Sequence, residues 1–383
     1  MLLNQGARRV PPRADPRVRV LVAPGFGGVG AAKYRACAEA GGEILVELDH
    51  DDLLASSALQ AIHEAFAERP DLALVYSHCA QILEDGSRDH SMFNTAYGWE
   101  YIEASVDGRA VQYPIAFQPT PHNISYIWFA PNHVRAFSRA AYEKAGGYDP
   151  ARNVLDDHDL MCRLYEVGDF HLIDDCLYLQ RMHPANTQSE KATNAFIQTE
   201  TVALYAQYIE RNALAWARRQ HLLALDLGAA HARPDGYVDR RDADDVDIIA
   251  ELPAPLPLAG GSVGVIRAVD FLEHVADKVA LFNEVYRLLA PGGLLLSQTP
   301  STDGRGAFQD PTHVGFYNEY PFWYFTEAKY QSYVPEIAAR FQVSRLVTHY
   351  PSEWHAEHNI SYVTANLIAL KESTPRNGGA ILW

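Results

Sequence analysis

Acidic residues gather at two places in the first half of this chain, in patterns that suit metal and proton chemistry. Asp49, Asp51 and Asp52 come directly after the apolar run 44–48. Three crowded carboxylates repel one another, so burial raises their pKa values unless a cation offsets the charge. A hard divalent ion such as Mg²⁺ or Mn²⁺ accepts carboxylate oxygens and leaves positions for phosphate oxygens. The alternative is a helix start, where Asp is favoured.

The second acidic group is the sequence LDDHDL at 155–160. It is preceded by GGYD at 146–149 and followed by RMH at 181–183. Carboxylates and an imidazole in these positions are suited to general base catalysis and to holding a divalent ion.

The elements around these groups alternate between strand and helix. We expect strands over 18–22, 44–48 and 72–77, helices over 31–40, 57–68 and 139–145, and a glycine-rich loop at 25–30. This alternation is typical of an α/β domain with a mostly parallel sheet, whose functional groups gather at the carboxyl ends of the strands. Residues 90–131 are rich in aromatics and proline and show few periodic elements, which favours a substrate-shaping region.

Taken in order, the glycine loop, the acidic run and the three later motifs resemble the family 2 glycosyltransferases of the GT-A fold, over roughly residues 18–190. The resemblance implies a nucleotide-sugar donor, a carbohydrate or small-molecule hydroxyl acceptor, and Mn²⁺ or Mg²⁺. It implies that Asp49, Asp51 and His183 hold the metal and the donor diphosphate. It also implies that Asp157 is the base that deprotonates the acceptor, with Asp156 and Arg181 beside the diphosphate and acceptor.

Three other residues in this region are expected to have structural roles. Asp159 is expected to orient the start of a helix. His122 and His133 are expected to be partly buried, with a place in the acceptor pocket as the alternative.

The N-terminus departs from the family pattern. Family members begin with a strand, a helix and a second strand that bind the nucleotide, whereas only residues 1–17 precede the strand at 18–22. Residues 2–5 resemble the end of that helix. We therefore expect the first nucleotide-binding unit to be missing and nucleotide recognition to be incomplete.

The α/β pattern restarts after a helix over 196–220. Strands are expected over 222–227, 247–250, 263–269 and 294–298, with a helix over 276–289. The motifs are LDLG at 225–228, FLEHV at 271–275 and EVYRLLAPGG at 284–293, and small residues at a strand end allow a nucleoside cofactor to approach the backbone closely.

This succession resembles the class I S-adenosylmethionine-dependent methyltransferases, over roughly residues 222–371. The resemblance implies that Gly228 approaches the methionine part of the cofactor, that Asp239 or Asp242 binds the ribose, and that Glu251 lies near the adenine. The turn 228–233 has Ala where a second Gly is expected, and a Cβ there can obstruct a ligand. A scaffold without cofactor is the alternative.

A segment rich in aromatic residues follows, beginning with FQDPTH at 308–313. It resembles the substrate-side loop of such methyltransferases, in which His313 serves as general base for O-methylation, because its ordinary pKa lies near neutrality. The alternative is that His313 fixes the loop. His274 is expected to be structural.

Composition agrees with two enzymatic domains. The 383 residues fit two domains at roughly 100–200 residues each. The 32 basic and 48 acidic residues give a net charge of −16, which argues against general binding to nucleic acid or anionic lipid. No apolar run approaches the about 20 residues of a membrane span. Four cysteines without paired spacing favour buried thiols in a cytoplasmic protein. A homo-oligomer is left open.

The predicted fold class is α/β, with two Rossmann-like domains: a GT-A glycosyltransferase domain (1–195), a connecting helix (196–220) and a class I methyltransferase-like domain (221–383). The predicted function is sugar transfer to a hydroxyl group, combined with O-methylation of the glycan or product. The first alternative is that only the methyltransferase domain is active and the first is a glycan-binding or scaffold remnant. In the second, both domains are scaffold.

Overall fold

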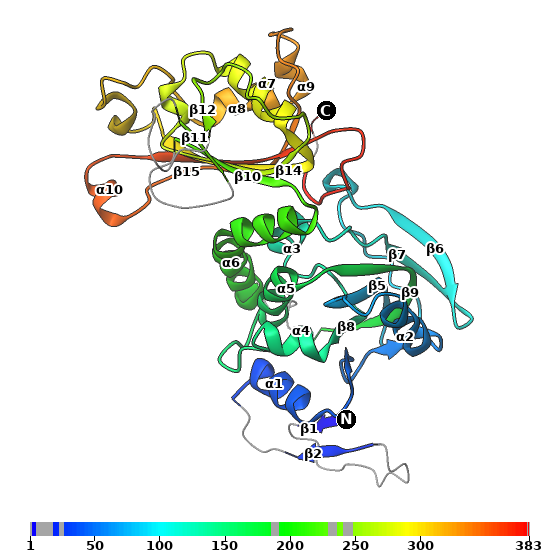
Figure 1. Cartoon of the computed structure of the whole chain (residues 1–383). Helices are drawn as coiled ribbons and strands as arrows, with labels where there is room; N and C mark the ends of the chain where they lie inside the picture. The colour runs from blue at the N-terminus through cyan, green and yellow to red at the C-terminus, as the bar shows by residue number, and fades with distance from the viewer. Residues whose placement is uncertain are drawn as a thin grey trace. The chain divides into compact units, whose positions relative to one another are not determined.

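The computed structural model describes residues 2–4, 18–22, 27–184, 191–228, 236–239, 248–380 and 382 (Figure 1). Its contacts divide the chain into two compact units. The first unit comprises Met1–Phe93 and Trp99–Asn212, and the second comprises Asn94–Gly98 and Ala213–Trp383. Each unit is built on a central β-sheet with helices, so the α/β prediction is confirmed for both.

The sheet of the first unit is mixed. Its strands lie in the order β3-β8-β5-β9-β4, comprising β3 (Ile44–Glu47), β4 (Leu53–Leu54), β5 (Leu74–Leu83), β8 (Arg135–Ser138) and β9 (Phe170–Met182). Only β5 and β9 pair in parallel, while β8 runs antiparallel between β3 and β5. The expected mostly parallel sheet is therefore wrong for this unit, because β8 enters the sheet from its opposite end.

Five helices of the first unit surround this sheet. They are α1 (Val29–Glu39), α2 (Ala58–Glu68), α3 (Pro121–Tyr126), α4 (Arg139–Lys144) and α5 (Asp156–Val167). The core of the unit joins the apolar face of α2, including Ile62 and Phe66, to β5 and β9. The expected helices at 31–40, 57–68 and 139–145 are present, each shifted by no more than two residues at either end.

Residues 90–131 contain more regular structure than their composition suggested. Strands β6 (Tyr101–Val106) and β7 (Arg109–Pro114) form a hairpin, preceded by a short 3₁₀ helix, η1 (Thr95–Tyr97). Asp107 and Gly108 make the turn with φ angles of 47° and 79°. An Asp-Gly pair with two positive φ angles is the favoured two-residue hairpin connection, so this dipeptide was the missed signal.

The N-terminal strand pair corrects another expectation. Leu2–Asn4 forms β1, which pairs in parallel with β2 (Val20–Val22) in a separate two-stranded sheet. The interpretation of residues 2–5 as the end of a helix is therefore wrong for 2–4, because the backbone there is extended and pairs with β2.

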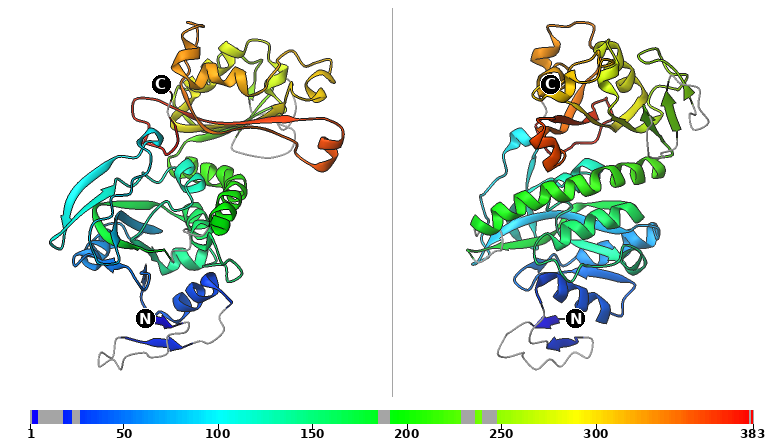
Figure 2. Two further views of the ribbon diagram at one scale, coloured as in Figure 1. Left: turned by 180° about the vertical axis from the view of Figure 1, so that it is seen from behind. Right: turned by 90° about the vertical axis from the view of Figure 1, so that its left-hand side faces the viewer.

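A single helix contains the division between the units. Helix α6 (Lys191–Arg219) is continuous and appears as a long green helix in Figure 2. The division falls between Asn212 and Ala213. Within the first unit, the Tyr208 hydroxyl donates to Asp159 Oδ1 of α5 at 2.7 Å. The Asn212 amide donates to the Ser125 hydroxyl of α3 at 2.9 Å. The first part of α6 is therefore integral to the first unit.

The sheet of the second unit has seven strands in the order β12-β11-β10-β13-β14-β16-β15. The strands are β10 (Leu223–Leu227), β11 (Gly236–Asp239), β12 (Ile248–Ile249), β13 (Val263–Val269), β14 (Leu289–Pro300), β15 (Phe341–His349) and β16 (Tyr362–Ala369). The first five are parallel and β16 is antiparallel to both neighbours. The strand order reverses between β10 and β13, which is where doubly wound sheets open a ligand crevice.

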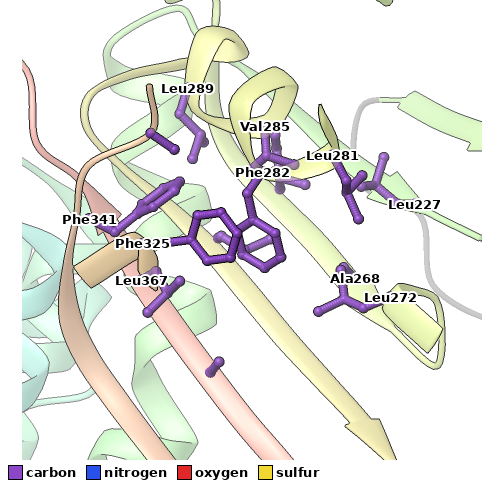
Figure 3. Packing of buried hydrophobic residues seen from close by; sticks show 14 of the residues in the cluster. Leu227, Ala268, Leu272, Leu281, Phe282, Val285, Leu289, Phe325, Phe341 and Leu367 are labelled. Atoms are coloured by element: carbon purple, nitrogen blue, oxygen red, sulfur yellow. The ribbon is translucent and has the colours of Figure 1, made fainter. Parts of the chain in front are cut away.

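The core of the second unit lies between this sheet and its helices (Figure 3). Phe282 of α7 (Lys278–Leu288) stacks on Phe325 of α8 (Glu319–Thr326) at 4.2 Å between ring centroids and meets Phe341 of β15 edge-on. The remaining short helices are η3 (Leu272–His274), η4 (Arg305–Phe308), α9 (Ala328–Gln331) and α10 (Glu353–Glu357). This packing holds fixed the strand ends that carry the second candidate site.

Candidate active sites

The acidic loop after β3 is held against strand β9. The Tyr178 hydroxyl donates to Asp52 Oδ2 at 2.8 Å and accepts the Asp49 N–H at 3.1 Å. The Arg181 N–H donates to Asp52 Oδ1 at 2.7 Å. Burial raises the pKa of Asp52, and these hydrogen bonds oppose the rise. Asp52 thus positions the loop.

Asp51 and His183 form the carboxylate–imidazole pair of this loop. Asp51 Oδ2 lies 2.7 Å from His183 Nε2, and both side chains are about one-fifth exposed, at 22% and 19%. Burial alone would raise the pKa of Asp51, but the hydrogen bond from His183 lowers it. An ionised carboxylate beside an imidazole, both open to solvent, is a suitable pair of ligands for a divalent ion.

Asp49 and Arg181 lie close to that pair but are held differently. Among the residues that the structure describes, Asp49, Asp51 and His183 do not form a group whose ligand atoms all lie within 4.8 Å of one another. Burial, together with the negative charge of Glu47, raises the pKa of Asp49 to about 6. The Arg181 guanidinium donates to the backbone carbonyls of Asp51, Leu83 and Glu84. Arg181 thereby ties the acidic loop to the end of β5.

Asp157 stands at the start of α5 in contact with a buried arginine. Arg135 Nη1 of β8 donates to Asp157 Oδ2 at 2.6 Å, and the His158 N–H donates to Oδ1 at 2.8 Å. Arg135 is 1% exposed, whereas the Asp157 side chain is 22% exposed. Burial would raise the pKa of Asp157, but Arg135 and Lys33 hold it well below its usual range. Asp157 is therefore an ionised carboxylate with access to solvent.

Asp156 has the opposite electrostatic character. It is 5% exposed, and its Oδ2 lies 3.4 Å from Lys33 Nζ of α1. Burial raises the pKa of Asp156 to about 6, with Lys33 opposing and the charges of Asp157 and Glu47 adding to the rise. The two adjacent carboxyl groups thus titrate in different pH ranges, and below about pH 6 Asp156 is protonated while Asp157 stays ionised, although they share one helix start.

Three charged residues around these carboxylates, Lys33, Glu47 and Arg135, were not predicted from the sequence. Lys33 forms an ion pair with Glu47, and Arg135 Nη1 lies 3.7 Å from Glu47 Oε2. Burial would raise the pKa of Glu47, but Lys33, His133 and Arg135 lower it to about 2. The available signal was a charged residue inside an otherwise apolar strand, since such residues are almost never fully buried unless paired.

The histidines and Asp159 of the first unit take structural positions. His122 and His133 are 2% and 6% exposed, and their rings stack on Tyr126 and Tyr178. Burial and the nearby Arg135 lower the pKa of His133 to about 3. Asp159 receives two hydrogen bonds from Arg163, at 3.0 and 2.6 Å, in addition to the one from Tyr208.

In the second unit, Gly228 ends β10 at the reversal of strand order. Its φ is +74°, and a Cβ added there would lie 2.7 Å from Cδ2 of Phe271. Both the backbone angle and the close approach of an aromatic ring therefore require glycine. Glycine at this strand end leaves the backbone open to a ligand in the crevice between β10 and β13.

Replacing Gly228 by alanine is expected to lower the free energy of unfolding by about 1–3 kcal/mol through φ strain, and further through the clash with Phe271. Gly261→Ala is the matched control, because Gly261 has the same φ of +74° and nothing within 4 Å of the added Cβ. Urea denaturation of both variants separates the two contributions. Equal losses for the two would contradict the assigned contact with Phe271.

The other predicted cofactor residues are placed less completely. Asp239 ends strand β11, and its side chain is outside the described part of the structure, as are Asp242 and the alanine-containing turn 229–233. Glu251 follows β12 and is exposed. Their contacts with ribose and adenine therefore stay predictions.

His313 and His274 lie together beyond the end of β13. Their ring centroids are 5.1 Å apart at 73°, and His313 Nδ1 donates to the Ala307 carbonyl at 3.0 Å. The 2% exposed Glu273 lies beside them and accepts a hydrogen bond from the Thr299 hydroxyl at 2.5 Å.

Asp270 was not predicted from the sequence. It directly follows β13 and has a φ of 49°. A positive φ is tolerated by Asp better than by most residues, so an Asp directly after a strand was the available signal.

Comparison with known families identifies both units. A family model described as glycosyl transferase family 2 matches residues 5–142, and one described as a methyltransferase domain matches residues 209–297. The chain therefore has a region that matches family 2 glycosyltransferases followed by a region that matches a methyltransferase domain, and both matches support a transferase. The predicted fold class, GT-A glycosyltransferase followed by a methyltransferase-like domain, is confirmed.

Curated relatives match a little under half of the chain. The chain is 25% identical over 178 residues to the hyaluronan synthase of Pasteurella multocida, covering 46% of this chain and 16% of the relative. It is 24% identical over 177 residues to the chondroitin synthase of Escherichia coli, covering 46% of this chain and 22% of the relative. The chain thus spans less than a quarter of the length of these relatives.

Solved structures of two kinds are similar to parts of this chain. Staphylococcus aureus TarS (residues 1–349) is 14% identical, with 52% of this chain and 56% of that chain covered and a TM-score of 0.33. The geranyl diphosphate C-methyltransferase of Streptomyces coelicolor is 14% identical, with 49% and 88% covered and a TM-score of 0.29. No helix in the described residues is long and apolar enough to cross a membrane.

Proposed function

We propose that the first unit transfers a sugar from a nucleotide-sugar donor to a hydroxyl of a carbohydrate acceptor, and that the second unit methylates a hydroxyl of the glycan with S-adenosylmethionine. The observation that carries the first part is the placement of Asp49. Asp49 comes two residues after Glu47, whose Oε2 lies 3.7 Å from the Arg135 Nη1 that donates to Asp157. The Asp49 N–H donates to the Tyr178 hydroxyl, which in turn donates to Asp52. In this proposal the metal-binding pair and the ionised carboxylate belong to one site.

The residues present fit a divalent ion, for which Asp51 and His183 are the first ligands. Their converging oxygen and nitrogen suit Mn²⁺, which accepts carboxylate and imidazole. A cation held by Asp51 and His183 would also counter the burial and the repulsion that raise the pKa of Asp49. When bound, the ion neutralises charge on the leaving diphosphate.

Asp157 takes the acceptor proton in this proposal. A base must be ionised before it accepts a proton, and Arg135 keeps Asp157 ionised. Each carboxylate oxygen has two lone pairs, so Oδ1 and Oδ2 can accept an acceptor hydroxyl in addition to their present donors. Arg135, buried against Asp157 and the Pro131 carbonyl, positions that carboxylate and does not touch substrate.

The names of the relatives support the proposed acceptor class. The matched synthases are named for hyaluronan and chondroitin, which are both carbohydrate polymers. A methyltransferase domain on the same chain supports a glycan hydroxyl as the methyl acceptor. In this proposal His313, whose Nδ1–H donates to the Ala307 carbonyl, keeps an Nε2 lone pair at the site of methyl transfer.

Calorimetry of the full chain with UDP- and GDP-sugars, with and without Mn²⁺, tests the first part. We expect binding that requires Mn²⁺ and that weakens more than about 10-fold in Asp51→Asn and His183→Asn, since even residues outside the ligand shell change metal affinity by about 10–100-fold. His63→Asn, an exposed residue of α2, is the control and should bind as the unchanged protein does.

Binding that is independent of metal, or absent for every donor, would contradict the proposal and favour a glycan-binding role for the first unit. The methyltransferase part is tested separately by thermal unfolding with S-adenosylmethionine. A ligand that binds only the native state stabilises it, by about 2.7 kcal/mol at 100 times its Kd. An unchanged transition would contradict the second part alone.

A further inference from the structure

The cluster Glu273, His274 and His313 in the second unit has the composition and spacing of a metal site. Each residue offers one ligand atom, and these atoms all lie within 4.8 Å of one another. Glu273 and His274 belong to η3, directly after β13, whereas His313 lies on the loop after η4. Two separate segments of the chain therefore bring the three side chains together.

The two segments are fastened to each other by the backbone. The N–H groups of Val314 and Gly315 both donate to the Glu273 carbonyl, at 2.9 and 2.7 Å. A Cβ at Gly315 would lie 2.7 Å from the Val275 carbonyl oxygen, so only glycine permits this close approach. The separation between Glu273 and His313 is therefore set by the fold.

Each side chain is oriented by a contact that leaves a ligand atom available. His313 Nδ1 lies 3.0 Å from the Ala307 carbonyl, which can only accept, so Nδ1 carries the proton and Nε2 keeps its lone pair. His274 Nδ1 lies 3.2 Å from the Thr312 hydroxyl and 3.4 Å from the Thr312 carbonyl. Thr299 donates to Glu273 Oε2 at 2.5 Å. Such outer contacts are the usual support of metal-binding histidines and carboxylates.

We propose that Glu273, His274 and His313 bind a divalent transition-metal ion. Two imidazole nitrogens and one carboxylate oxygen favour Zn²⁺, Fe²⁺ or Co²⁺ over Mg²⁺ or Ca²⁺, which prefer oxygen ligands alone. With three protein ligands, the ion keeps at least one position for water or substrate. This ion is distinct from the one assigned to Asp51 and His183 in the first unit.

The position of the cluster indicates what the open position binds. Glu273 lies two residues after Phe271, whose ring packs against Gly228 at the end of β10. The ion would therefore lie beside the crevice between β10 and β13, where the methyl donor is proposed to bind. An acceptor hydroxyl bound to the ion loses its proton more easily.

The resulting step is methyl transfer to the acceptor oxygen, and it rests on the proposed methyltransferase function. The acceptor hydroxyl gives up its proton to solvent as its oxygen binds the ion. That oxygen then forms a bond to the methyl carbon while the bond from this carbon to the sulfonium sulfur breaks. S-adenosylhomocysteine and the methyl ether leave.

Titration of the full chain with Co²⁺, followed by visible absorption, tests the ion site directly. We expect the absorption of nitrogen-ligated Co²⁺ to persist in His183→Asn, in which the first-unit pair is broken. Starting from that variant, Glu273→Gln and His313→Asn should each weaken Co²⁺ binding more than about 10-fold. Thr299→Val, which removes only the hydroxyl on Glu273, should weaken it about 10-fold, and His63→Asn should leave it unchanged.

Unchanged Co²⁺ affinity in both Glu273→Gln and His313→Asn would overturn the site. If Glu273→Gln does not fold, His313→Asn, at a partly exposed residue, and the conservative Thr299→Val still decide the question. Co²⁺ binding without a thermal shift by S-adenosylmethionine would leave the ion site standing while the methyltransferase function failed. The reverse result would overturn the ion site alone.

Discussion

Replacing Asp157 by asparagine is expected to lower kcat for sugar transfer by about 10²–10⁴-fold, the usual contribution of a general base. Asparagine keeps the shape of the side chain but cannot take a proton. The KM for the donor should change little, because Asp157 faces the acceptor in the proposal. Initial rates with the donor identified by calorimetry, measured at saturating acceptor, give both constants.

Asp156→Asn is the matched control for that experiment, because the two residues are adjacent at the start of α5. The pH dependence of kcat separates them further. A base whose pKa lies well below its usual range stays ionised, so at Mn²⁺ concentrations that keep the metal site filled the rate should not fall between pH 7 and about pH 5. A base with the pKa of about 6 assigned to Asp156 would lose activity about tenfold per pH unit below that value. Such a decline, or full activity in Asp157→Asn, would assign the base to another residue.

Replacing Arg135 by methionine is expected to lower the free energy of unfolding by about 3–5 kcal/mol, the cost of breaking a buried ion pair from one side. Arg135 is 1% exposed and supplies the hydrogen bonds to Asp157 and to the Pro131 carbonyl. Its removal leaves Asp157 and Glu47 with less compensation for their burial. Urea denaturation at pH 7 measures the loss.

The loss should shrink as the pH falls. Glu47 and Asp157 have folded pKa values below their unfolded values of about 4, so their stabilising contribution is present above pH 4 and fades as the pH falls through the folded values. Removing Arg135 raises both folded values and reduces that contribution. The free energies of unfolding of the unchanged protein and the variant should therefore converge as the pH falls from about 4 toward about 2.

A surface ion pair provides the comparison for Arg135. Arg69 Nη2 lies 3.0 Å from Asp71 Oδ2, with the Arg69 side chain 46% exposed. Arg69→Met should cost less than about 1 kcal/mol, as exposed pairs do. Equal losses in the two variants would show that the Arg135 network contributes no more than a surface pair.

The positions of the acidic motifs at the ends of elements could be predicted from the sequence, because each motif is a local pattern next to a strand or helix. Asp49–Asp52 follows β3, and Asp156-Asp157 begins α5, as expected of residues at strand ends and helix starts. The partners of these carboxylates could not be predicted from the sequence. Glu47 within β3 and Arg135 within β8 show from their apolar surroundings that a charge is buried, but not which opposite charge meets it. That information lies in the strand order, which places β8 beside β3.

The second unit shows the same division between local and distant information. The strand β13 was predicted with its observed bounds, and Gly228 was predicted at the end of its neighbour. His274 and His313 were each noticed within their own motif. Their meeting with Glu273 depends on the backbone bonds from Val314 and Gly315, which no spacing in the sequence reveals.

The continuous helix α6 decides how this protein can be divided for biochemical work. A fragment that stops at residue 195, the boundary predicted from sequence, would lack Tyr208 and Asn212, and with them the hydrogen bonds to Asp159 and Ser125. A fragment that starts at 221 would lack Ala217, which packs against Gly264 of β13. Fragments that end at residue 195 or begin at residue 221 are therefore unsuitable for assays of either activity. Two fragments that both contain α6 (Lys191–Arg219) would preserve the contacts of both units. The first would end at residue 219, and the second would begin at the start of the helix.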